Sequence, residues 1–120
     1  MSASLYKVIH LVGIIMVFLA LGGALLNSIN SGVKDYAFRK QVGMYHGIGL
    51  FLVLLGGFGM MAKLNYSYGD GWFLVKVVIW VALGAMLTMG TKKPEQGKMF
   101  WLVTLLLGAG AAYLGVMKPF

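Results

Sequence analysis

Three side chains inside the long apolar stretches of this 120-residue chain need an explanation: His10, His46 and Lys76. An ionisable side chain at the centre of a membrane span costs about 2.5–3.5 kcal/mol on insertion scales, and it usually faces the interior of a helix bundle. A neutral imidazole and a neutral amine both bind metal ions and haem iron, and an apolar pocket favours the neutral amine of a lysine. These residues are therefore the candidates for a binding site.

The composition indicates that the surroundings of these residues are a lipid bilayer. Hydrophobic residues make up 60% of the chain and charged residues 11%, and the mean hydropathy is +0.86. A soluble domain of this length needs a larger charged surface. The absence of cysteine excludes disulfides, thiolate metal sites and cysteine nucleophiles. The net charge of +7 comes from cations between the apolar runs, with no basic stripe carrying interleaved aromatics, so nucleic acid is not expected as a partner.

Four apolar runs, at about 5–27, 43–62, 72–90 and 99–117, are each long enough to cross a hydrocarbon core of roughly 30 Å. Backbone groups in lipid must be satisfied within the segment, so the runs are predicted to be helices. The first run is too long for the core of a signal peptide, and we expect it to be a span. The predicted fold is all-α, a single up-down four-helix transmembrane bundle over residues 1–120.

The loop cations predict the orientation of this bundle. One side carries Lys34, Arg39, Lys40, Lys92, Lys93 and Lys98, and the other carries Lys7, Lys63 and Lys118. Because cytoplasmic loops hold the excess of Lys and Arg, both termini are expected outside the cytoplasm. In the long first connection, Val33, Tyr36 and Phe38 suggest a segment at the interface.

His10 and Lys76 are predicted to lie at matching depth, because the first and third spans run parallel from the same side. They therefore form a candidate ligand pair. His46 enters from the opposite face, so it is assigned to a second site, a structural contact or a proton path. Other interpretations remain open, since Lys76 is about 7 Å from Gly71 along the helix axis and its amine can extend to the headgroups. Either histidine can hydrogen-bond a neighbouring helix.

The glycines allow two interpretations. Gly13 and Gly49 each follow a histidine by three residues on the same helix face. Glycines on membrane helices usually permit close packing of a partner helix, but they also leave a slot for a flat macrocycle or a quinone ring.

Short motifs in three of the runs resemble one family of membrane proteins. The run LYKVIHLVGIIMVFLALGG contains Lys7-Val-Ile-His10, which is similar to the K-x-x-H opening of the HemJ-type protoporphyrinogen oxidases and the related SirB and CopD-like four-helix proteins. Trp72 and Lys76 match the W-x-x-x-K stretch of that family, and MYHGIGLFLVLLGG resembles the SirB pattern of a histidine followed ten residues later by glycine, here Gly56.

The resemblance implies a protein of the bacterial inner membrane that holds haem b through His10 and Lys76. The stretch from Leu21 to Leu26 lacks the arginine and proline that close the first helix of HemJ-type proteins, and Thr88 is the polar residue late in the third run. These departures count against the oxidase reaction rather than against the haem pocket.

Three functions follow from these patterns. The first is a haem-binding membrane protein engaged in electron transfer or porphyrin chemistry, with haem iron as its metal, a quinone as an alternative ligand and no catalytic residue identified. The second is a non-enzymatic scaffold or subunit that packs through glycine faces with further copies of itself or with a membrane complex. The third is an oligomeric small transporter or channel, although no carboxylate lies inside a run.

Overall fold

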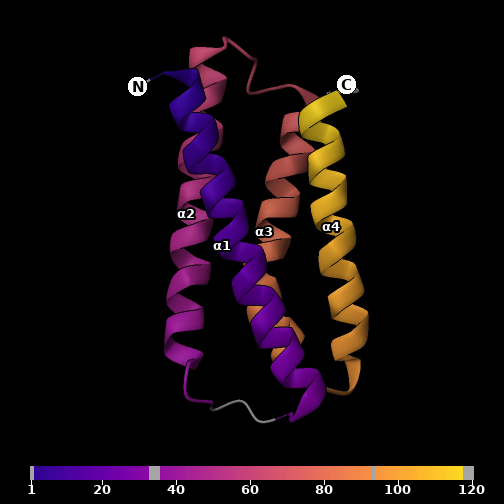
Figure 1. Cartoon of the computed structure of the whole chain (residues 1–120). Coiled ribbons are helices and arrows are strands. Elements are labelled where there is room, and N and C mark those ends of the chain that lie inside the picture. The colour runs from indigo at the N-terminus through magenta and orange to yellow at the C-terminus, as the bar shows by residue number, and fades with distance from the viewer. Residues whose placement is uncertain (1, 33–35, 93, 118–120) are drawn as a thin grey trace.

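The computed structural model describes residues 2–32, 36–92 and 94–117, which form four long helices and one short 3-10 helix without any strand (Figure 1). The elements are α1 (Ala3–Asn30), α2 (Arg39–Lys63), α3 (Gly71–Lys92), η1 (Pro94–Gln96) and α4 (Gly97–Met117). The prediction of an all-α four-helix bundle is confirmed. Four residues used in the sequence argument lie outside the described residues: Val33, Lys34, Lys93 and Lys118.

The helices reach beyond the predicted apolar runs because polar residues form their ends. Ser2 caps α1, and its side-chain oxygen accepts a hydrogen bond from the Leu5 amide at 3.1 Å. At the other end, Gly32 adopts a positive φ of 69° and donates its amide to the Ser28 carbonyl. A glycine in this left-handed conformation is a common way to end a helix.

All four helices are long and apolar enough to cross a membrane. Their outward surfaces are also apolar, with Leu19 75%, Val78 66% and Val116 79% exposed. Such a surface suits lipid rather than water as the solvent. The chain is therefore an integral membrane protein.

The helices alternate in direction, and both ends of the chain lie at the same end of the bundle (Figure 1). The connection between α2 and α3 lies at this end too. The connection from α1 to α2 and the η1 turn lie at the opposite end, where Arg39, Lys40, Lys92 and Lys98 are found. The up-down topology expected from the short connections is thus observed.

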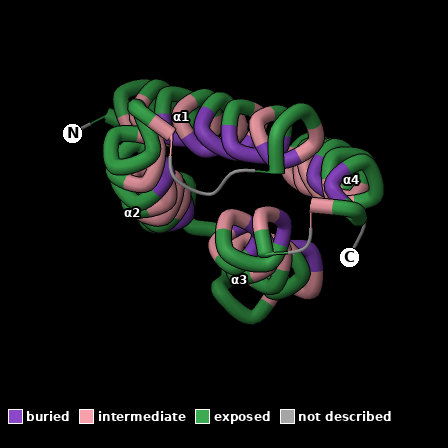
Figure 2. Tube along the Cα trace, turned by 90° about the horizontal axis from the view of Figure 1, so that it is seen from below, coloured by how far each residue is buried: buried purple, intermediate pink, exposed green. Residues whose placement is uncertain are grey.

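Helix α1 crosses the bundle at an angle, beginning beside α2 and ending beside α4 (Figure 1). Seen from the end, α1 lies along one side and α3 along the opposite side, with α2 and α4 near the two ends of α1 (Figure 2). The contact between α1 and α2 is the most extensive, and that between α2 and α3 is slight. The main core packs around Val17, Leu21, Leu83 and Met86.

Three glycines bring the backbones of α1 and α2 together, and we call Gly13, Gly49 and Gly56 the glycine seam. A Cβ atom added at Gly56 would lie 2.5 Å from the His10 amide nitrogen, and one at Gly13 would lie 2.6 Å from the Val53 amide nitrogen. At these positions a partner helix fills the space beside glycine. The packing interpretation therefore holds for the glycine seam, and no slot for a ring remains there.

Candidate functional site

His10 lies in the first half of α1, where its half-buried ring reaches over to α2. Its Nδ1 donates a hydrogen bond to the Val53 carbonyl at 2.8 Å. A carbonyl only accepts, so Nδ1 carries the proton and Nε2 of the neutral ring keeps its lone pair. The bond fixes the ring against α2, near Gly57, where an added Cβ would lie 3.5 Å from the ring. His10 thus presents the lone pair of Nε2 in a fixed orientation.

Lys76 is half-buried in the second turn of α3, and its side chain lies against α4. Its Nζ atom lies 3.1 Å from the position of a Cβ added at Gly115. The side chain is also within electrostatic range of the His10 ring. The two helices run parallel from the same end of the bundle, and the structure brings these two candidate residues near one another.

His46 lies elsewhere, buried at 4% exposure between α2 and α3. Its Nε2 donates to the Leu83 carbonyl at 3.1 Å. The sequence analysis gave a hydrogen bond to a neighbouring helix as one of the possible roles of His46, and the structure contains such a bond. The bond ties His46 to the contact between α2 and α3, apart from the pair formed by His10 and Lys76.

Trp80 makes the reciprocal contact across the same pair of helices. Its indole Nε1 donates to the Leu50 carbonyl at 3.0 Å, so α3 reaches back to α2. The sequence analysis did not single out this residue. The signal was present, because an indole N–H inside an apolar run needs an acceptor when it is buried.

The described residues contain no cluster of three or more histidine, cysteine or carboxylate side chains able to hold a metal ion. His10 presents one oriented ring nitrogen, and the Lys76 amine is a second nitrogen nearby.

Comparison with protein-family models, with curated proteins and with solved structures gives no match to this chain. The fold and composition define the class of protein, a small integral membrane protein with four spans. The resemblance to the HemJ, SirB and CopD-like proteins stays a prediction.

Proposed function

We propose that the protein binds haem within the membrane and that the nitrogens of His10 and Lys76 would hold its iron. One observation carries the proposal, the hydrogen bond from His10 Nδ1 to the Val53 carbonyl. Metal-binding histidines almost always donate their other ring nitrogen to a carbonyl, carboxylate or water, which fixes the tautomer and makes the ligand more basic. His10 has this arrangement.

The second ligand also supports this proposal. Lys76 approaches from α3 and is half-buried, and its neutral amine would coordinate iron. Bound haem would supply one-electron redox chemistry, which suits electron transfer with a membrane quinone or a reaction on a porphyrin. The chain's own residues would orient the ring of His10, hold the amine of Lys76 and exclude water with apolar side chains.

The test is the visible spectrum of the protein purified from cells supplied with haem. We expect a Soret band in the wild type, its loss in His10→Ala and a shifted or weakened band in Lys76→Met. His46→Ala is the matched control, because it removes the other histidine and should leave the band unchanged. Retained helical circular dichroism would show that the variants fold. A wild type without a Soret band, or a His10→Ala variant with the same band, would contradict the proposal.

A second candidate function, a membrane scaffold or subunit, is favoured by the two other interhelical bonds. His46 and Trp80 donate to helix carbonyls just as His10 does, so all three contacts share one structural purpose in that case. This candidate predicts that no cofactor co-purifies and that His10→Ala and His46→Ala lower the stability of the bundle by similar amounts. A second copy of the chain or a membrane complex would then cover the apolar outer faces.

We further infer that the end of the bundle bearing Arg39, Lys40, Lys92 and Lys98 faces the cytoplasm of a bacterial inner membrane. At the other end, the described residues with cationic side chains are Lys7, Lys63 and Lys76, and Lys76 lies inside the third span rather than in a loop. Alkaline phosphatase fused to the C-terminus should be active, and a green fluorescent protein fused there should be dark. The reverse pattern would overturn the orientation.

A further inference from the structure

A groove of about 170 Å³ lies between α1 and α4, and its lining is apolar apart from one threonine. The lining residues are Phe18, Gly22 and Leu25 of α1 and Trp101, Thr104 and Leu105 of α4. Small-molecule sites usually have volumes of roughly 300–1,000 Å³, so this groove is too small to enclose a whole ligand of that kind. It is open to the outer surface, where Trp101 is 45% and Leu105 61% exposed. Because this surface faces lipid, the groove suits a narrow apolar group such as one acyl chain.

Gly22 provides the open space of this groove. No atom lies within 4 Å of a Cβ added at Gly22, whereas a Cβ added in the glycine seam would meet the backbone of the partner helix. Glycine in a membrane helix either permits close packing or leaves a slot, and at Gly22 the described chain leaves the slot open. The neighbouring Gly23 also has open space beside it, but Gly23 does not line the groove.

Lys98 places a positive charge at one end of the groove. It is exposed in the first turn of α4, three residues before Trp101 and seven before Leu105. This spacing puts the three residues on the same face of the helix. A lysine near the end of a span lays its apolar stem along the helix and keeps its amine at the level of the headgroups. Glu95, the nearest carboxylate in the sequence, is exposed in η1, and Lys98 forms no ion pair with the described residues.

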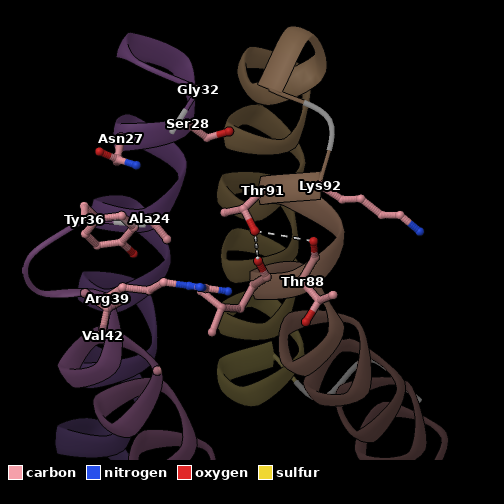
Figure 3. Close-up of a pocket in the computed structure, with 12 residues that line it drawn as sticks. Ala24, Asn27, Ser28, Gly32, Tyr36, Arg39, Val42, Thr88, Thr91 and Lys92 are labelled. Carbon is pink, nitrogen blue, oxygen red and sulfur yellow. Dashed lines mark hydrogen bonds between the residues drawn. The ribbon is translucent and has the colours of Figure 1, made fainter. Parts of the chain in front are cut away.

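The other described cations at this end of the bundle belong to helices that do not form the groove. Lys40 is the second residue of α2, just as Lys98 is the second residue of α4, but α2 and α4 share no contact over the described residues. Lys92 is in the last turn of α3, and its side chain extends away from α1 (Figure 3). Arg39 is on α2 beside Lys40. Lys98 is therefore the described cation that shares a helix with the groove at this end.

We propose that the groove binds one acyl chain of an anionic phospholipid and that Lys98 pairs with the phosphate of its headgroup. The acyl chain would lie against Phe18 and Trp101, over the open space beside Gly22. The headgroup would lie at the start of α4, where Lys98 is exposed. Charge complementarity favours an anionic lipid over the zwitterionic phosphatidylcholine, because lysines near the membrane surface attract anionic headgroups. This proposal is independent of haem binding.

The experiment uses the full chain in vesicles of equal parts phosphatidylglycerol and phosphatidylcholine, with bromine on the acyl chains of one lipid or the other. Bromine quenches the fluorescence of a tryptophan that it contacts, and Trp101 is a reporter inside the groove. Of the other two tryptophans, Trp72 is 7% exposed, and the Trp80 indole is held by its hydrogen bond to Leu50. Both leaflets hold the same lipids, so the orientation of the chain does not affect the result.

We expect phosphatidylglycerol to be favoured over phosphatidylcholine beside Trp101 by roughly five-fold, the preference expected for one lysine near the membrane surface. Trp101→Phe should remove the difference in quenching between the two brominated lipids. A difference that persists in Trp101→Phe would place the preferred lipid outside the groove and would contradict the proposal.

Two pairs of variants separate the groove from general attraction between charges. Lys98→Gln should abolish the preference for phosphatidylglycerol, and Lys40→Gln, which removes one exposed lysine from the equivalent position of α2, should retain it. Gly22→Leu should lower the quenching of Trp101 by brominated phosphatidylglycerol, because the new side chain fills the groove. Gly23→Leu is its matched control, since it adds the same side chain to open space outside the groove. Retained helical circular dichroism would show that the variants fold.

Three results would overturn the proposal. The first is equal quenching of the wild type by the two brominated lipids. The second is a loss of preference in Lys40→Gln as large as that in Lys98→Gln, which would assign the preference to the net charge of this end. The third is an equal effect of Gly22→Leu and Gly23→Leu, which would show that the acyl chain does not occupy the groove.

Discussion

Helix α2 meets its two neighbours in opposite ways. Against α1, the glycine seam lets backbone approach backbone, so an added Cβ at Gly49 would lie 2.9 Å from the Gly13 carbonyl oxygen. Against α3, contact is slight, and the long side chains of His46 and Trp80 span the distance to the carbonyls of Leu83 and Leu50. One interface depends on the absence of side chains and the other on their length.

The difference shows two means of holding helices together where lipid is the solvent. Lipid tails are as apolar as leucine, so burying apolar surface gives little drive between helices in a membrane. Close packing of small residues and interhelical hydrogen bonds supply the association instead. Helix α2 uses the first means towards α1 and the second towards α3, and each should fail under a different kind of substitution.

The largest effect is expected for Gly56→Ala in the glycine seam. The added Cβ would lie 2.5–2.7 Å from the amide nitrogen, Cβ and Cα of His10, and two of these atoms belong to the backbone. Overpacking of this kind typically costs about 1–3 kcal/mol. The free energy of unfolding in mixed micelles, followed by tryptophan fluorescence, measures the loss.

Gly47→Ala on the same helix is the control for this prediction. No atom lies within 4 Å of a Cβ added at Gly47. Alanine is a better helix former than glycine by about 1 kcal/mol in a helix interior, so this variant should be as stable as the wild type or more stable. Equal losses in the two variants would show that the glycine seam is not the basis of the α1–α2 interface.

A smaller effect is expected for Trp80→Phe between α2 and α3. The substitution removes the indole N–H that donates to Leu50 and keeps an aromatic ring. Interhelical hydrogen bonds in membranes contribute about 0.6 kcal/mol on average, and Leu50 lies mid-helix, where its carbonyl keeps its bond within α2. We expect a loss of about 0.6 kcal/mol, measured by circular dichroism during unfolding. A loss as large as that of Gly56→Ala would remove the contrast between the two interfaces.

The smallest effect is expected for Tyr36→Phe, just before the first turn of α2. Burial raises the pKa of the Tyr36 phenol above its usual value of 10.0, while the neighbouring Arg39 guanidinium acts on this pKa in the opposite direction. The folded chain therefore favours the neutral phenol, and this contribution to stability is complete below pH 10.0 and is lost as the pH rises through the folded-state pKa.

Comparison of wild type and Tyr36→Phe across this range isolates the phenol, since the two proteins differ in this hydroxyl group alone. Above pH 10.0 the wild type should lose more stability than the variant. An equal loss of stability in the two proteins would contradict this prediction, because it would show that the Tyr36 phenol is as exposed to water in the folded chain as in the unfolded chain.

The spans and their alternation could be predicted from the sequence because run length and short connections leave few alternatives in a bilayer. The placement of His10 and Lys76 at the same end of the bundle followed from the same argument, because residues early in two parallel spans lie at similar depth in the membrane. These features depend on position along the chain, which a sequence shows directly.

The direction of each side chain could not be predicted, since it depends on the angle at which α1 crosses the bundle. That angle brings Gly56 onto the backbone of His10, whose ring then reaches Val53.

The oblique course of α1 bears on how the protein is made. Helix α1 contacts α2, α3, α4 and η1, whereas α2 and α4 share no contact over the described residues. In an assembly that follows the order of the chain, α1 comes before the other three described helices, and each later span would find α1 as a partner already in place. The α1–α2 hairpin would close on the glycine seam first, and α3 and α4 would then dock on the part of α1 that remains free. The bundle can thus assemble in the order in which its spans leave the ribosome.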